Sequence, residues 1–179
     1  MAIIKQVVGT RTSLTTTALN SLASGTYVSC GSITHNTNQP LDVLIEVTAT
    51  PGTVSGNKQL LVFAKASLDG TNQSTGPETG TSTVDEPNLY FVGSLPLNTN
   101  AASQTKMFSL ASAYGGRLPY ASEIVVRNDS GAALNASGHM SFENPFRYHN
   151  DSVLPELLSK SFHDFCLRFL RLFPGHSIY

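Results

Sequence analysis

The sequence predicts an all-β protein, an antiparallel β-sandwich of the jelly-roll-like kind with an amphipathic helix appended at its C-terminal end. Up to residue 146, short apolar or alternating segments are separated by turn residues. Outside a turn at Thr17–Leu22, this region never keeps a helical period for more than two turns. After residue 146 the composition and the period change together. We therefore expect a sandwich domain at 1–146, with an N-terminal arm over about residues 1–17, and a helical tail at 147–179.

Eight short segments carry the strand pattern. The clearest is Leu41–Thr48, in which every odd-numbered residue is aliphatic, so that these residues share one face. The segment Lys58–Ser67 is more continuously apolar, which is typical of a strand covered on both faces, and it ends at an Asp69-Gly70 turn. The other six segments are Ile3–Val8, Thr26–Ile33, Leu89–Leu95, Thr105–Ala111, Glu123–Asn128 and Ala133–Phe142. We predict buried side chains at Val43, Ile45, Leu61, Phe63, Phe91, Val125 and Leu134.

The C-terminal segment has helical spacing over Val153–Phe173, with Ser152 as the N-cap and Pro174-Gly175 as the stop. The apolar face consists of Leu154, Leu157, Leu158, Phe162, Phe165, Phe169 and Leu172. This face can pack on a neighbouring subunit or on the sandwich, it can lie in a membrane interface, or the tail can be loosely attached sequence with little role. Packing is favoured, because three cations against two acidic residues give little net attraction to lipid.

The composition excludes several partners. Only 13% of the residues are charged and the formal net charge is −1, while Ser, Thr and Asn together make up 51 of 179 residues. A chain so close to neutrality lacks the electrostatic footprint of a nucleic-acid-binding protein. It has no apolar run of about 18 residues and no signal-peptide pattern at its start, so we expect no membrane partner.

No constellation of residues predicts catalysis or metal binding. The five histidines, at positions 35, 139, 149, 163 and 176, are scattered without ligand spacing and are interpreted as solvated loop residues. Phosphate-loop and nucleophile-elbow motifs are absent. Asp85-Glu86 with Asp69 offers too few oxygens for calcium. We therefore predict a protein that is not an enzyme, with no catalytic, cofactor-binding or metal-binding residues and no cofactor.

The two cysteines, Cys30 and Cys166, lie 136 positions apart. Two cysteines cannot form a disulfide framework or a four-cysteine zinc site. A single long-range bridge stays open as an alternative. We favour two buried, inert thiols, because Cys30 ends an apolar strand pattern and Cys166 belongs to the helical segment.

Several strings of the sequence together resemble small β-rich structural proteins of tailed bacteriophages. The strings are SLASGTYVSCGSI, LDVLIEVTAT, GNKQLLVFAKASLDGTN, FSLASAYGG and VVRNDSGAALNASG, and the resemblance spans about residues 13–142. It includes no catalytic or ligand motif. It implies a virion component on the outer capsid surface, most simply a capsid decoration (cement) protein. Such a protein binds the major capsid protein and copies of itself, often as a trimer, and staples neighbouring capsomers.

Three segments are expected to make the contacts with partners, namely the N-terminal Met1–Thr17, the long loop Asp69–Asn88 and the helix Val153–Phe173. Two alternatives stay open. One is a tail, neck or fibre-associated virion protein, which would look similar in sequence. The other is a glycan-binding sandwich that uses exposed tyrosines, for which the candidates are Tyr90, Tyr114 and Tyr120, because the chain contains no Trp.

Overall fold

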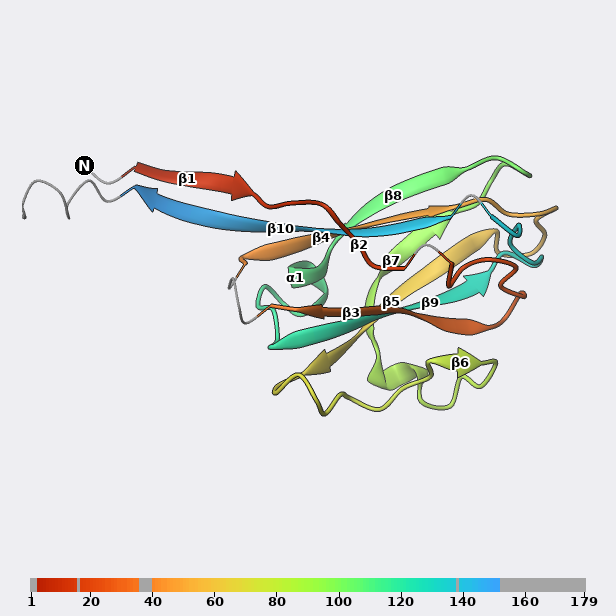
Figure 1. The fold of residues 1–179 in the computed structure, drawn as a ribbon. Coiled ribbons are helices and arrows are strands. Elements are labelled where there is room, and N and C mark those ends of the chain that lie inside the picture. Colours follow the sequence, from red (N-terminus) through yellow and green to blue (C-terminus); the bar gives the residue numbers. More distant parts are fainter. Residues whose placement is uncertain (1–2, 16, 36–39, 138, 152–179) are drawn as a thin grey trace, which may run out of the picture. The chain divides into compact units, whose positions relative to one another are not determined.

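The computed structural model describes residues 3–15, 17–35, 40–137 and 139–151, which fold into antiparallel strands with little helix (Figure 1). Contacts along the chain divide it into two units. Residues 7–147 form one unit, and the described part of the other consists of residues 3–6 and 148–151. The predicted helix Val153–Phe173 lies outside the described residues.

The first sheet has the strand order β1-β10-β4-β8, and a short strand, β2, also pairs with β10. Every pairing whose register is resolved in this sheet is antiparallel. The central strand β4 has β10 on one side and β8 on the other. The strands are β1 (Ile3–Val8), β2 (Thr12–Ser13), β4 (Asp42–Ala49), β8 (Gln104–Ser109) and β10 (Met140–Asp151).

The second sheet has the strand order β6-β3-β9-β5-β7 and is also antiparallel. The strands are β3 (Tyr27–Thr34), β5 (Gln59–Ser67), β6 (Thr79–Gly80), β7 (Tyr90–Pro96) and β9 (Ala121–Asp129). Two single-turn helices complete the described fold, the 3-10 helix η1 (Glu86–Asn88) before β7 and the α-helix α1 (Leu110–Ala113) after β8.

The all-β, antiparallel prediction is confirmed, and seven of the eight predicted strands lie within a residue or two of their predicted bounds. The segment Thr105–Ala111 stops being a strand at Ser109, because the Ser109 hydroxyl accepts the Ser112 N–H and begins α1. The prediction of a strand over Ala133–Phe142 is wrong for its first half. There Leu134 makes only an isolated bridge to Pro51, and β10 begins at Met140.

The core lies between the two sheets of the unit formed by residues 7–147. Alternate residues of the central strands point into it, and it includes Val43, Ile45 and Val47 from β4, Leu60, Val62 and Ala64 from β5, and Ile124 and Val126 from β9. Of the residues predicted to be buried, Val43, Ile45, Phe63, Val125 and Leu134 are confirmed. Leu61 is only partly buried.

The prediction that Phe91 is buried is wrong, since its side chain is 56% exposed. Its strand, β7, is the edge of the second sheet and pairs on one side only, with β5. The Phe91 ring contacts Phe63 edge-on, with ring centroids 5.7 Å apart. It therefore lies on the outer face of the sheet, where an edge residue has a neighbour on one side alone.

Cys30 is a free thiol that is completely buried in the core. Burial in apolar surroundings disfavours the thiolate and raises the pKa of Cys30 to about 12. This confirms the interpretation of Cys30 as a buried thiol. Cys166 lies outside the described residues.

Candidate functional site

The outer face of the second sheet is covered in part by the long loop that joins β5 to β7. This loop carries β6, which pairs with β3, and η1, which leads back into β7 (Figure 1). At its end Leu89 packs in a small apolar cluster with Tyr27, Phe63 and Val125, all on the outer face. The loop is therefore part of the folded sandwich, and the face that it builds is the candidate interaction surface.

The loop begins with a tight turn after β5. One carboxylate oxygen of Asp69 accepts the backbone N–H groups of Thr71 and Asn72, at 2.8 and 2.7 Å. The hydrogen bonds from Asn72 and Thr71 hold the pKa of Asp69 well below its usual range. Gly70 has a φ of +82°, and a Cβ there would lie 2.7 Å from the Tyr120 ring. The predicted Asp-Gly turn is thus confirmed, and glycine is needed there for both reasons.

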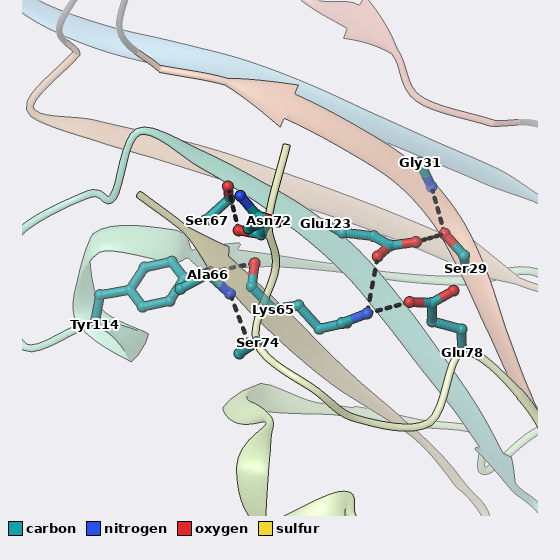
Figure 2. A network of polar contacts seen from close by, with 10 residues as sticks. All are labelled: Ser29, Gly31, Lys65, Ala66, Ser67, Asn72, Ser74, Glu78, Tyr114 and Glu123. Carbon is teal, nitrogen blue, oxygen red and sulfur yellow. Dashed lines mark hydrogen bonds and ion pairs between the residues drawn. The ribbon is translucent and has the colours of Figure 1, made fainter. Parts of the chain in front are cut away.

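An ion-pair network anchors the middle of the loop (Figure 2). Lys65, on the outer face of β5, is only 4% exposed. Its ammonium group pairs with Glu78 of the loop and with Glu123 of β9, the latter at 3.5 Å. The other carboxylate oxygen of Glu123 accepts the Ser29 hydroxyl of β3. One buried cation therefore links two strands of the sheet to the loop above them.

A second anchor holds the loop at η1. The carboxylate of Glu86 accepts the Tyr27 hydroxyl and, at 3.2 Å, a guanidinium N–H of Arg127. The Arg127 guanidinium also lies over the Tyr27 ring, 5.4 Å from its centroid. Burial, together with the hydrogen bond to Glu86, raises the pKa of Tyr27 to about 12. The phenol thus stays protonated and can donate to Glu86 over the whole physiological range.

With both anchors in place, the loop presents an ordered surface. Leu68 and Val84 are 87% and 82% exposed on it, although both are aliphatic. Of the three acidic residues considered for calcium, Asp69 is engaged in the turn and Glu86 in the second anchor. Within the described ranges, no three His, Cys, Asp or Glu side chains form a group that could hold a metal ion. In the same part of the chain, no helix is long and apolar enough to cross a membrane.

Two of the histidines are not solvated, which corrects the interpretation made from the sequence. His35 and His139 are 3% and 4% exposed. The Thr50 N–H donates to Nδ1 of His139 at 3.1 Å, so Nε2 carries the proton and donates to the Asn135 carbonyl at 2.8 Å. His139 therefore links the start of β10 to the end of β4. The side chain of His149 and all of His163 and His176 lie outside what the structure describes.

His35 is the first member of a chain of hydrogen-bonding side chains that continues through Ser122 of β9 to Tyr114. Its Nε2 lies 2.9 Å from Oγ of Ser122, and this Oγ lies 3.0 Å from the Tyr114 hydroxyl oxygen. The Tyr114 hydroxyl also lies 3.1 Å from the carbonyl oxygen of Lys65, so its proton can go to that carbonyl or to Ser122 Oγ. Nδ1 of His35 is buried and has no hydrogen-bond partner among the described residues.

The three tyrosines proposed as a sugar platform have different environments. The rings of Tyr90 and Tyr114 meet edge-on with centroids 4.6 Å apart, and the Tyr114 hydroxyl is engaged in the chain described above. Tyr120 is 38% exposed and its ring rests on Gly70. Of these tyrosines, Tyr90 and Tyr120 retain exposed ring surface.

The resemblance to phage proteins rests on short strings of the sequence. No family model, curated protein or solved structure matches the chain. Functional arguments therefore depend on the topology, the surface and the contacts of this chain itself.

Sequence reasoning missed both the Lys65–Glu123 pair and the His35–Ser122 contact. A signal was present for the first, because Lys65 interrupts the apolar run of β5, and a cation within such a strand requires a partner. For the second there was no signal, since His35 and Ser122 meet only through the pairing of β3 with β9.

Burial of His35 predicts that the protein loses stability in mild acid. Burial lowers the pKa of His35 to about 4, whereas an unfolded histidine has a pKa near 6.5. As the pH falls below 6.5, the unfolded state takes up a proton that the folded state does not, so the free energy of unfolding decreases until about pH 4. We expect this histidine to contribute a loss of about 2–3 kcal/mol, measured by denaturant unfolding at several pH values.

The control for this prediction is His35→Gln, which keeps a polar side chain beside Ser122 but cannot titrate. The difference in unfolding free energy between the two proteins should change between pH 6.5 and 4 and stay constant above pH 7.5. If the unfolding free energies of the two proteins change in parallel over the whole pH range, His35 takes up a proton equally well in the folded and unfolded states. That result would contradict the effect expected from its burial.

Proposed function

We propose that the protein is a non-enzymatic structural component of a bacteriophage virion, a capsid decoration or cement protein on the outer shell. In this role it binds the major capsid protein and further copies of itself, with a trimer as the simplest oligomer, and staples neighbouring capsomers. Nucleic acid and membrane are not among its proposed partners. The observation that carries the proposal is the order of the strands in the two sheets.

That order is the one expected of a jelly roll. Without the two-residue strands β2 and β6, the remaining eight strands lie in the orders 1-8-3-6 and 2-7-4-5. The pairs β1·β10, β3·β9, β4·β8 and β5·β7 then join the first strand to the eighth, the second to the seventh, the third to the sixth and the fourth to the fifth. Such pairing is what a long hairpin rolled into two sheets would give, and it supports the jelly roll as part of this proposal. Jelly rolls are frequent in viral capsid proteins, although lectins and cupins also use them.

The surface supports a role in protein contacts. Exposed apolar side chains lie on the anchored loop, at Leu68 and Val84, and on the edge strands, at Phe91 of β7 and Met107 of β8. These side chains could become buried if another protein binds over them. Many copies on one lattice can turn modest contacts into stable attachment, because each further contact is effectively intramolecular.

The second candidate function is a tail, neck or fibre-associated virion protein. It differs from a decoration protein in location and copy number but needs no change in fold. A glycan-binding sandwich is the third candidate, with Tyr90 and Tyr120 as its exposed aromatic side chains. A glycan array that gives saturable hits would favour this third candidate.

Purified particles of the source phage provide the direct test of location. Cryo-electron microscopy of the virions, with mass spectrometry of the same sample, measures where the protein lies and how many copies there are. We expect density on the shell at a copy number comparable to that of the major capsid protein. A few copies at the tail would overturn the decoration proposal in favour of a tail, neck or fibre-associated protein. Absence from the particle would overturn both proposals.

Removal of the C-terminal segment is predicted to leave the fold stable and to weaken binding to the capsid. A chain that ends at Asp151 keeps all of β10, which continues beyond the predicted domain boundary at residue 146. We expect its melting temperature to stay within about 3 °C of that of the full chain, a change of less than about 1 kcal/mol. Binding to undecorated shells, measured by co-sedimentation, should fall at least tenfold. Unchanged binding would contradict the contact role of residues 152–179.

A further inference from the structure

The long loop that joins β5 to β7, residues 68–89, covers part of the second sheet but buries almost none of its own side chains. Of these residues, all of which the structure describes, only Leu89 is buried, at 8% exposed. On the sheet, Tyr27, Phe63 and Val125 are 2%, 5% and 0% exposed and pack with Leu89. A segment with few buried apolar contacts of its own opens at a lower free energy than core strands do.

A space of about 650 Å³ remains between this loop and the sheet. It is lined by polar side chains from both, namely Lys65 and Glu123 of the sheet and Ser74, Glu78 and Asp85 of the loop. Elements that form a protein interior leave few voids, because their side chains interdigitate at close-packed density. Here the loop is instead held across a space by polar contacts.

The middle of the loop is attached to the sheet by its two anchors and by β6, which pairs with β3 over only two residues. Each anchor joins a loop carboxylate to a cation of the sheet, Glu78 to Lys65 (Figure 2) and Glu86 to Arg127. The side chains of Glu78 and Glu86 are 48% and 27% exposed, so dissolved ions can approach both carboxylates. Salt therefore weakens both attachments by screening.

The loop also has a natural hinge at each end. The Ser74 N–H donates to the Ala66 carbonyl at 2.9 Å, and the Ser74 hydroxyl oxygen accepts the Ala66 N–H at 3.2 Å, which fixes Ser74 to the end of β5. At the other end β7 follows directly. Between these points, the Asn88 side-chain amide donates to the Thr75 hydroxyl oxygen at 3.2 Å. Residues 75–89 are thus joined to each other and can move together.

We propose that residues 75–89 form a latch, a segment that lifts off the outer face of the second sheet as one unit while the sandwich stays folded. Because both anchors are partly exposed ion pairs, salt shifts the latch towards its open state. The open latch uncovers Tyr27, Phe63 and Val125, so it controls how much apolar surface this face presents. The inference goes beyond the proposed function, because it concerns the folded chain alone and holds whether or not the protein belongs to a virion.

The test is thiol labelling of the full chain carrying Val125→Cys, with the modification of each cysteine measured by mass spectrometry of its peptide. Val125 packs with Leu89 of the latch, whereas the native Cys30 is buried in the core and reports opening of the whole sandwich. The introduced thiol should react about tenfold faster than Cys30, or more. The matched control is Val126→Cys, at the next position of β9, where the side chain lies in the core. Its thiol should react as slowly as Cys30.

A double variant assigns the opening to the anchors. Glu78→Gln with Glu86→Gln, combined with Val125→Cys, removes both loop charges and keeps side chains of nearly the same shape. We expect the ratio of the two labelling rates, introduced thiol to Cys30, to rise about tenfold. With both carboxylates present, about 1 M NaCl should raise this ratio about threefold, and in the double variant salt should leave it unchanged.

Because Val125→Cys changes a buried position, hydrogen exchange of the unmodified chain provides a second measurement. The protected backbone amides of β6 and η1, which belong to the latch, should exchange about threefold faster at about 1 M NaCl than in low salt. The amides of β9, which has a strand on each side, should show no such increase.

Two results would overturn the inference. Equal labelling of Cys30 and the thiol introduced at position 125 would show that the loop opens only when the whole sandwich opens. A labelling ratio that neither salt nor the double variant changes, with hydrogen exchange equally insensitive to salt, would show that the two anchors do not control the opening.

Discussion

Replacement of Ile45 by aspartate is expected to prevent the protein from folding. Ile45 lies in β4, the central strand of the first sheet, opposite Phe108 of β8, and its side chain is completely buried in the core. The substitution removes a buried aliphatic group, at a cost of about 2–5 kcal/mol, and places an unpaired carboxylate among apolar neighbours, at a cost of several kcal/mol more. The sum reaches the total stability of a typical domain of this size, about 5–15 kcal/mol.

The measurement is the soluble fraction after expression, followed by far-ultraviolet circular dichroism of any soluble protein. Two control substitutions test whether the loss comes from burying a carboxylate or from any substitution at or near this position. Ile45→Val keeps an aliphatic side chain and should cost about 1 kcal/mol. Leu41→Asp introduces the same carboxylate just before β4, where the side chain is 47% exposed, and should change stability by about 0.5 kcal/mol or less. Soluble Ile45→Asp protein with the wild-type spectrum would contradict the position of β4 in the core.

Leu41 and Ile45 also show how far the sequence could predict the fold. Alternation of apolar residues identifies the face that points to the core, since side chains on a strand alternate strictly between faces. It does not identify the residue at which the strand begins. Leu41 has the phase of the buried residues, but β4 begins at Asp42 and Leu41 lies outside the sheet. Strand existence and phase are local properties, whereas strand ends depend on which neighbours are present to pair.

Phe91 and Lys65 illustrate a second limit. Both lie on the outer face of the second sheet, and their exposures are opposite to what their polarity suggests, 56% for the phenylalanine and 4% for the lysine. The reason is tertiary, because the β5–β7 loop covers Lys65 and leaves Phe91 at the open edge. The composition of residues 69–88 predicts a long loop there. Its attachment to the sheet depends on Glu78 and Glu86, which no local pattern connects to Lys65 and Tyr27.

The surroundings of His35 depend on more than the strand pattern. Its imidazole contacts Ser122, which in turn contacts Tyr114, and these two residues come from β9 and from the position after α1. These residues are separated by eight positions in sequence, and His35 lies 87 positions from Ser122. A scattered histidine in a sequence is reasonably interpreted as solvated. Only the three-dimensional contacts reveal that one of its nitrogens is buried without a partner.

The second large effect is expected at Lys65. The Lys65→Met variant keeps most of the aliphatic volume and removes the cation that Glu123 faces at 3.5 Å. The Glu123 side chain is only 11% exposed, so its charge would stay buried with the Ser29 hydroxyl as its remaining partner. Loss of one member of a buried ion pair typically costs about 3–5 kcal/mol, because the other charge is left uncompensated. We expect a loss in this range, measured by denaturant unfolding at pH 7.

Two further variants show that the penalty comes from the charge of Glu123. Glu78→Gln removes the other partner of Lys65, but the Glu78 side chain is 48% exposed and its charge is solvated, so we expect a loss of less than about 1 kcal/mol. The double variant Lys65→Met with Glu123→Gln has no buried charge, and the amide can still accept the Ser29 hydroxyl. It should therefore recover at least half of the stability lost in Lys65→Met. If the double variant is no more stable than the single one, the loss comes from packing around the lysine stem, and the ion pair does not stabilise the attachment of the loop to the sheet.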